Sequence, residues 1–255
     1  MKNLNPTLRF NLTAVVLAAA LLFTGLLASG ADDFVTLDDL FDDEIGATGP
    51  KISDPLEPIN RVVFHFNDFL FLWVMQPIAE TYKIVTPDPI ESSLTNFFNN
   101  LAFPKRFVAN LAQGKWEGAY VETGRFLVNS TVGLGGIKRP ADSIEMLKPI
   151  ENEDMGQALG ALGIGHGPYL ILPVFGPSSA RDFAGFMGDR AVDPFKYPFI
   201  QVDDWKLRTG YGVGGIIVKS PTIVKTYRQM KMGSLDSYVA LRNGYFQYRK
   251  AAVED

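Results

Sequence analysis

The sequence of 255 residues contains no cysteine and only two histidines. Without a thiol, disulfides, zinc ribbons, iron–sulfur clusters and thiol nucleophiles are all excluded. His65 and His166 lie far apart along the chain, so a histidine-rich metal site is excluded too. There is also no excess of positive charge, because 24 Lys and Arg stand against 28 Asp and Glu. A general nucleic-acid-binding protein would be basic, so we expect no nucleic-acid partner.

The first thirty residues have the pattern of an export signal. Lys2 and Arg9 precede an apolar run over Leu12–Leu27, and small residues follow at positions 28–31. We therefore expect residues 1–30 to be a signal peptide that directs export across a bacterial inner membrane. An uncleaved anchor helix is the alternative, but such a run spans only about 24 Å of a ~30 Å hydrocarbon core. No later apolar run reaches about 18 residues, so no ordinary transmembrane helix is expected after it.

Residues 31–53 differ in composition from the rest of the chain. They contain seven acidic residues, and Lys51 is their only base. This charge pattern predicts an acidic, mostly flexible linker. The whole chain is 47% hydrophobic and 20% charged, which excludes a disordered protein. We expect one folded domain over residues 54–250.

Helix start signals recur along this predicted domain. Asp54-Pro55-Leu56-Glu57 and Asp88-Pro89-Ile90-Glu91 each place an Asp at the cap, a Pro at the first helical position and a Glu within the first turn. Ser179 and Ser220-Pro221 indicate two further starts. Each of the four is expected to begin a helix.

The first predicted helix is unusually apolar. Helical spacing is shown by Ile59, Val62, Val63, Phe66, Phe69, Leu70 and Trp73. Its opposite face carries Asn60, Arg61 and Asn67, but its second half is apolar almost all round. Such a helix is either buried in protein or faces lipid. Gln76-Pro77 is expected to end it.

The later segments predict an all-α protein with one irregular loop. Amphipathic stripes occur over residues 94–101, 107–111, 116–130 and 238–248. Between them, residues 163–177 are rich in Gly and Pro, with a short extended piece expected at Tyr169–Leu172.

Sites of chemistry are nearly absent from the sequence. Neither a Gly-x-Ser-x-Gly elbow nor a P-loop is present. His166 could serve as a general base with Ser178 or Asp182, but a loop histidine between glycines is more often structural. The Asp189–Asp193 and Asp203–Asp204 pairs are more plausible as caps than as metal ligands. We therefore expect no enzyme, no metal and no cofactor.

Several motifs resemble those of one protein family, the MlaA (VacJ) family of outer-membrane lipid-transport proteins. The resemblance covers roughly residues 54–250, in order. It rests on Asp54-Pro55-Leu56-Glu57-Pro58-Ile59-Asn60-Arg61, Asn96-Phe97-Phe98-Asn99-Asn100-Leu101, Arg125-Phe126-Leu127-Val128-Asn129-Ser130-Thr131 and, most specifically, Gly165-His166-Gly167-Pro168-Tyr169 through Leu172-Pro173-Val174-Phe175-Gly176-Pro177.

The resemblance implies a ring-like arrangement of amphipathic helices around a lipid channel. Its implied function is to remove misplaced phospholipids from the outer leaflet and pass them to a periplasmic carrier of the MlaC type. Trimeric porins are the implied partners. For lipid passage we single out polar residues on the apolar helices, namely Asn60, Arg61, Asn67, Arg125 and Asn129. For shaping or gating the opening we single out the loop residues Gly163, Gly165, His166, Gly167, Pro168, Tyr169, Pro173, Gly176 and Pro177.

Structural roles remain open for some of these residues. Arg125 could instead pair with Asp182 or Glu122, and Asn129 could be a cap. Many members of the family carry a lipid on a cysteine after the signal, whereas Ala31 stands there in this chain. We therefore expect an envelope protein of a Gram-negative bacterium, on the periplasmic side of the outer membrane and without a lipid anchor. The alternative functions are a porin-associated scaffold and a periplasmic hydrolase built on His166.

Overall fold

The computed structural model describes residues 54–193 and 205–254. The predicted signal peptide and acidic linker lie outside these residues. Helices dominate the described part, with a single two-stranded sheet. The elements are α2 (Glu57–Leu70), the π-helical turn η2 (Phe71–Met75), α3 (Gln76–Val85), α4 (Asp88–Leu101), α5 (Phe103–Ala112), α6 (Trp116–Thr131), the 3-10 turns η3 (Pro140–Ser143) and η4 (Glu145–Leu147), α7 (Met155–Ala161), β1 (Tyr169–Leu172), β2 (Gly176–Ser179), α8 (Ala180–Ala191), α9 (Trp205–Gly233) and α10 (Ser237–Glu254).

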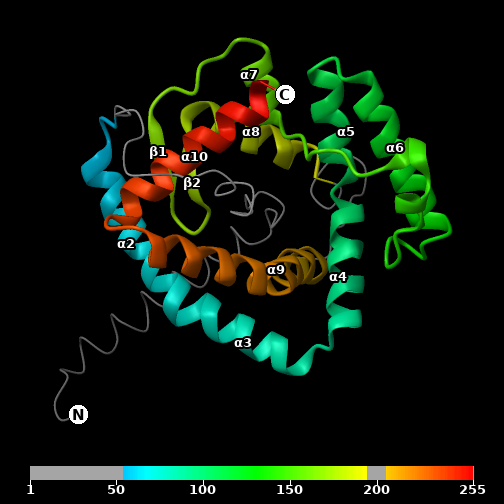
Figure 1. Ribbon diagram of the computed structural model, residues 1–255, viewed down its shortest axis with the longest axis horizontal. Helices are drawn as coiled ribbons and strands as arrows, with labels where there is room; N and C mark the ends of the chain where they lie inside the picture. The colour runs from blue at the N-terminus through cyan, green and yellow to red at the C-terminus, as the bar shows by residue number, and fades with distance from the viewer. Residues whose placement is uncertain (1–53, 194–204, 255) are drawn as a thin grey trace.

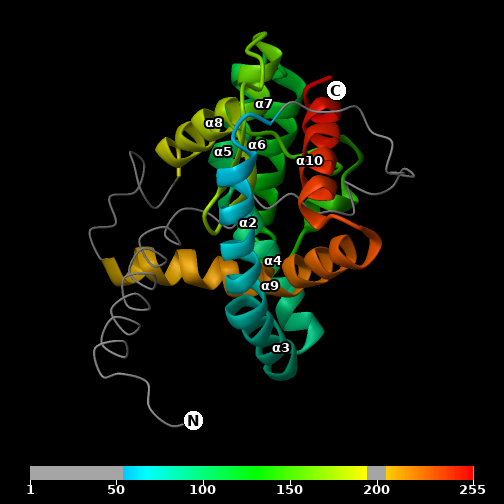
Figure 2. The same cartoon turned by 90° about the vertical axis from the view of Figure 1, so that its left-hand side faces the viewer.

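The helices are arranged as a ring (Figure 1). Helix α3 packs on α9, α9 on α4, α4 on α5, α5 on α7, and α7 on α10. The circuit closes through the hairpin, because β2 contacts α10 and β1 contacts α2. Figure 2 shows α9 crossing the line of α2 and α3 at a steep angle. The predicted all-α, ring-like fold is confirmed, with the addition of one short hairpin.

One expected helix end is wrong. Helix α2 does not stop at Gln76-Pro77 but continues through η2 into α3. The amide of Gln76 donates to Phe71 O, the wide spacing of a π turn, and Pro77 follows at the start of α3. Proline has no backbone N–H to donate. It is tolerated at position 77 because the π turn has already shifted the backbone hydrogen-bond pattern there.

This continuation gives a longer apolar helix than was expected from the sequence. Glu57–Val85 forms 29 helical residues, long and apolar enough to cross a membrane by length and composition alone. Only 17% of its most apolar stretch is buried within the protein. This length was not expected, because Gln76-Pro77 is predicted to end the helix.

Helices begin at three of the four predicted starts, but only one of them has the expected side-chain cap. Asp54 lies ahead of α2 without capping it, and α4 begins at Asp88 itself without a side-chain cap. Ser220 lies inside α9, where its hydroxyl donates to Ile217 O at 2.7 Å, so that start is wrong. Ser179 does cap α8, accepting the amide of Asp182 at 3.2 Å.

The hairpin occupies the predicted irregular loop. Tyr169–Leu172 is extended as expected, and it pairs antiparallel with Gly176–Ser179, from Tyr169 opposite Ser179 to Leu172 opposite Gly176. Strand β2 was not foreseen, because Gly-Pro-Ser-Ser has little intrinsic strand preference. The tight connection holds Val174 at a φ of 75°, which is unusual for a β-branched residue.

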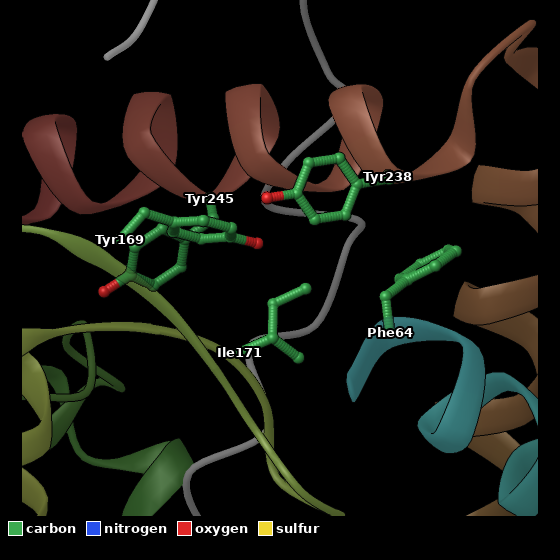
Figure 3. Packing of buried hydrophobic residues seen from close by; sticks show 5 residues of the cluster. All are labelled: Phe64, Tyr169, Ile171, Tyr238 and Tyr245. Atoms are coloured by element: carbon green, nitrogen blue, oxygen red, sulfur yellow. The ribbon is translucent and has the colours of Figure 1, made fainter. Parts of the chain in front are cut away.

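A compact aromatic cluster fastens the hairpin to two helices (Figure 3). Phe64 comes from α2, Tyr169 and Ile171 from β1, and Tyr238 and Tyr245 from α10. Tyr169 is 0% exposed and its ring lies 5.8 Å from that of Tyr245. Burying these large rings stabilises the junction at which the ring of helices closes.

Candidate functional site

The outer face of α2 and α3 is an exposed apolar surface. Val62 and Trp73 are each 69% exposed, Phe69 is 57% exposed and Ile84 is 83% exposed. A monomeric protein in water rarely presents such a continuous apolar face, so this surface is suited to lipid or to another apolar partner. The sequence left two alternatives for this helix, and the structure combines them: Val62, Phe69 and Trp73 are exposed, whereas Phe64 is buried in the aromatic cluster.

The inner face of α2 carries Asn60, which is bound to the hairpin. Asn60 is 2% exposed. Its Nδ2 donates to Tyr169 O at 3.0 Å and to Asp54 Oδ1 at 3.1 Å, and its Oδ1 accepts the amide of Ile171 at 2.9 Å. The side-chain amide thus replaces a neighbouring strand at the free edge of β1.

Asn67 repeats this interaction two helical turns further on. Its Nδ2 donates to Leu172 O at 2.9 Å and its Oδ1 accepts the amide of Val174 at 2.7 Å. Seven residues of helix rise about 10.5 Å, and three residues of strand extend about 10 Å. The two asparagines therefore match two points three residues apart on the hairpin, and they hold it parallel to the helix.

The other lipid-path candidates also have partners within the fold. Arg61 pairs with Glu57 at 2.8 Å and with Asp236 at 2.9 Å, and it lies 4.4 Å from the centroid of the Tyr238 ring. It thereby connects α2 to the start of α10.

Arg125 and Asn129 lie on α6, on the opposite side of the ring from α2 (Figure 1). Arg125 is buried, donating to Leu147 O at 2.5 Å and to Asp142 at 2.7 Å. The suggested pairs with Asp182 and Glu122 are therefore wrong. Asn129 Oδ1 accepts the amide of Ala141 at 3.1 Å, a cap-like contact with η3. The five residues thus form two separate groups rather than one site.

The loop before the hairpin is exposed and depends on glycine. Gly163, Gly167 and Gly176 all have positive φ values, of 85°, 68° and 85°. Gly165, Ile164 and Pro168 are exposed, as is Pro173 in the turn, whereas Pro177 is half-buried in β2. His166 is exposed, and its ring meets that of Phe246 edge-on at 4.7 Å.

The arrangement around His166 does not resemble a hydrolytic site. Its Nδ1 lies 2.5 Å from Gly167 O. The hydroxyl of Ser178 is directed to Ser179 O, and Asp182 is bound by arginines and Tyr245. Within residues 54–193 and 205–254, no three His, Cys, Asp or Glu side chains are placed to hold a metal ion.

A buried network of charges joins α7, α8 and α10. Arg249 donates to Asp154 at 2.5 Å and 3.0 Å and to Asp182 at 3.0 Å, and the hydroxyl of Tyr245 also donates to Asp182. Burial alone would raise the pKa of Asp154, but the charge and hydrogen bonds of Arg249 outweigh burial and lower it. The same balance lowers the pKa of Asp182, where Arg181 also contributes.

This network was not found by sequence reasoning. Asp154 is a capping residue for α7, where it and Gln157 form a capping box. The one local signal in the sequence was therefore Asp-x-x-Gln before a short helix. The ion pairs of Arg249 with Asp182 and Asp154 join residues that are 67 and 95 positions apart in the sequence, and no local pattern reveals them.

Comparison with known proteins identifies the family. The family model described as MlaA lipoprotein matches residues 52–252. The chain belongs to the MlaA lipoprotein family. It is 30% identical over 206 residues to the intermembrane phospholipid transport system lipoprotein MlaA of Haemophilus influenzae, covering 80% of each chain. It is 31% identical over 198 residues to the protein of that name from Escherichia coli K12, covering 76% of each.

A solved structure agrees with this membership. A chain determined in a study of the structural basis for maintenance of bacterial outer membrane lipid asymmetry has a TM-score of 0.67 and 27% sequence identity. The match covers 79% of this MlaA-family chain and 100% of the solved one. The family predicted from the motifs is confirmed. The named relatives are transport lipoproteins and not enzymes, in agreement with the expectation of a non-enzymatic protein.

The predicted localisation is corrected by the same comparison. We expected an envelope protein without a lipid anchor, whereas the family and its named relatives are described as lipoproteins. That expectation is wrong. It rested only on the absence of cysteine. The position after the predicted signal, to which it referred, lies outside the described residues.

Proposed function

We propose that this protein removes phospholipids misplaced in the outer leaflet and passes them to a periplasmic carrier. As an MlaA-family protein, it works in intermembrane phospholipid transport and helps to maintain outer-membrane lipid asymmetry. The observation that best supports the proposal is the exposed apolar surface of α2 and α3 on the outside of a ring of helices. A lipid-transfer protein needs such a surface in contact with acyl chains.

The apolar surface is suited to acyl chains by both its size and its chemistry. Each large apolar side chain moved from water into hydrocarbon contributes about 1.5–3 kcal/mol. Several side chains of α2 and α3 together therefore support stable insertion of this face. The charged side chains Glu57 and Arg61 lie at the start of α2 and pair with each other, which reduces the cost of placing them near lipid.

The five polar candidates and the loop over residues 163–177 have different roles in this proposal. Asn60 and Asn67 position the hairpin against α2, so the exposed loop ahead of it is held at one edge of the ring. Residues 163–177 would then shape or gate the opening. Arg61, Arg125 and Asn129 would act through the fold that surrounds the lipid path. The functional unit is the domain over residues 54–250, preceded by the signal over 1–30 and the linker over 31–53.

The finer partners belong to the same proposal. A periplasmic carrier would receive the lipid, and a trimeric porin would hold the protein in the outer membrane. The exposed apolar surface offers one face for such an assembly. The resemblance of the motifs to those of the MlaA family and the proposed transport role support these partners.

The deciding experiment compares outer-leaflet phospholipid in cells with and without the gene. We expect accumulation on deletion and a return to normal when the intact gene is restored. An unchanged outer leaflet, in a parent strain with the protein present in its outer membrane, would contradict the transport proposal and favour the scaffold alternative. Porin co-purification from the same strains then tests that alternative directly.

A further inference from the structure

Helix α8 exposes a stripe of large side chains that has no role in the proposed function. Phe183, Phe186, Met187 and Arg190 follow the i, i+3, i+4, i+7 spacing of one helix face. Phe183 is 40% exposed and Met187 is 52% exposed. The other face of α8 lies against α7, where Gly185 is so close to the backbone of Gly156 that a Cβ would overlap it. The close packing on α7 therefore fixes the direction in which the stripe points.

The hairpin turn extends this stripe. The ring centroid of Phe175 lies 5.0 Å from that of Phe186, and Phe186 lies 6.5 Å from Phe183. The position of Phe175 depends on α2, because Asn67 accepts the amide of the preceding Val174 at 2.7 Å. We call the set the α8 patch, and it consists of Phe175, Phe183, Phe186, Met187 and Arg190.

Arg190 differs from the other arginines whose side chains the structure describes. Every other arginine whose side chain the structure describes pairs with a carboxylate, whereas Arg190 lies over the ring of Phe186, 5.4 Å from its centroid. Burial lowers the pKa of Arg190, and Asp193 opposes this effect through its charge. A guanidinium nevertheless stays protonated in proteins. The patch thus combines aromatic rings with a half-buried cation that forms no salt bridge with a carboxylate of residues 54–193 or 205–254 whose side chains are described.

This combination matches the chemistry of a phospholipid. A guanidinium binds a phosphate oxygen pair through two parallel N–H bonds, and such charge-assisted bonds are stronger than neutral ones. The neighbouring rings and Met187 offer hydrocarbon contact within reach of the same molecule. A purely apolar partner would leave the cation unsatisfied, and a free phosphate would leave the rings in water.

We propose that the α8 patch holds one phospholipid during transfer, with its phosphodiester on the Arg190 guanidinium and an acyl chain along Phe183, Phe186 and Phe175. The proposal rests on the transport role proposed above and assigns a binding site within it. Phosphate recognition comes from Arg190, so head groups that share the phosphodiester can share the site. The occupant is a lipid molecule and not a protein segment.

The test measures lipid binding by the full-length protein purified in detergent. Native mass spectrometry compares dioleoyl-phosphatidylglycerol with dioleoylglycerol, which has the same chains and no phosphate. We expect Arg190→Gln to weaken phosphatidylglycerol binding about tenfold, which corresponds to ~1.4 kcal/mol. Dioleoylglycerol binding should be unchanged. Arg190→Lys should restore part of the loss. Arg228→Gln, which removes an exposed arginine of α9 paired with Glu80, is the matched control and should bind both lipids normally.

The acyl contact is tested by Phe183→Gln, which should weaken both lipids to a similar extent. Inorganic phosphate should compete only weakly with phosphatidylglycerol, because it makes no acyl contact. Thermal unfolding of each variant confirms that it is folded. Phosphatidylglycerol binding by Arg190→Gln at the wild-type level, or an equal loss of dioleoylglycerol binding, would overturn the site.

Cell measurements keep this proposal separate from the proposed function. If the intact gene corrects the outer leaflet and the Arg190→Gln gene does so equally well, the α8 patch is overturned and the transport role stands. Partial correction by Arg190→Gln, at equal protein abundance, supports the patch. If deletion of the gene leaves the outer leaflet unchanged, the transport role fails whatever the purified protein binds.

Discussion

Two asparagines on α2 show how single residues connect an exposed apolar helix to the hairpin. Asn60 and Asn67 each use both ends of a side-chain amide, and each binds one carbonyl and one amide of the hairpin. An aspartate could accept but not donate, and a leucine could do neither. The polar residues on this apolar helix are therefore explained first by the strand edge that they satisfy.

Replacing Asn60 should destabilise the fold markedly. Asn60→Ala leaves Tyr169 O and the amide of Ile171 without their partner in a buried site, which we expect to cost about 2–3 kcal/mol. Denaturant unfolding in detergent measures the loss. Asn96→Ala is the control, since its 3.3 Å bond to Ile137 O is exposed, and it should change stability by less than about 0.5 kcal/mol. Equal effects of the two variants would contradict the strand-edge role.

Two glycines of α8 should respond in opposite ways to the same substitution. A Cβ at Gly185 would overlap the backbone of Gly156, which cannot move aside, so Gly185→Ala should destabilise the protein by about 1–3 kcal/mol. A Cβ at Gly188 would meet only the side chain of Met155 at 3.4 Å. Gly188→Ala should therefore be neutral or stabilise the helix by up to about 1 kcal/mol. Thermal unfolding of both variants checks the pair, and a stable Gly185→Ala protein would show that α7 and α8 are less tightly packed.

At the scale of whole elements, helix α2 continues through a π turn into α3 and presents one apolar face over 29 residues. Charge on that face should oppose membrane binding without disturbing the fold. Val62 is 69% exposed, so Val62→Asp creates no cavity.

For Val62→Asp we expect binding to phospholipid vesicles to fall about tenfold or more, since a carboxylate must leave water with the helix. Vesicle flotation measures the bound fraction. Gln247→Asp adds the same charge at an exposed position of α10 and should bind as the wild type does. If the two aspartate variants lost binding equally, overall charge rather than the α2 surface would be responsible.

Elements were predictable from sequence where their signals are local. Apolar spacing located the helices around Phe66, Phe97 and Phe126, because a helix face repeats within a few residues. The predicted cap at Asp54 failed because its carboxylate binds Tyr238 and Arg242, over 180 residues away.

The candidate site was predictable only in part, for the same reason. Sequence reasoning selected Asn60 and Asn67 as unusual, but their hairpin partners lie 105 to 111 residues further on. Strand β2 and the Arg249 network likewise depend on contacts that only the folded chain brings together. Neither spacing nor composition contains that information.

At the scale of the whole molecule, buried charges connect the helices on one side of the ring. Lys105 of α5 lies 3.7 Å from Asp189 of α8, and Asp189 accepts the amide of Met155 at the start of α7 at 3.0 Å. Burial raises the pKa of Asp189 to about 6, although Lys105 acts against the increase. Asp182 on the same helix has a lowered pKa, because Arg249 and Arg181 outweigh its burial.

These two carboxylates should give stability opposite dependences on pH. The unfolded pKa of Asp189 is about 3.9, so its favourable contribution is complete below that pH and is lost as the pH rises through about 6. The free energy of unfolding of the wild type should therefore fall by about 1–3 kcal/mol relative to that of Asp189→Asn between pH 4.5 and 7.5.

Asp182 contributes to the stability of the fold above its unfolded pKa, and this contribution is lost as the pH falls through its lowered folded pKa. Relative to Asp182→Asn, the wild type should gain stability as the pH rises. Thermal unfolding in detergent from about pH 2.5, where the contribution of Asp182 declines, up to about pH 7.5 measures both differences. Parallel trends for the two variants would show that the charge environments of Asp182 and Asp189 are not distinct.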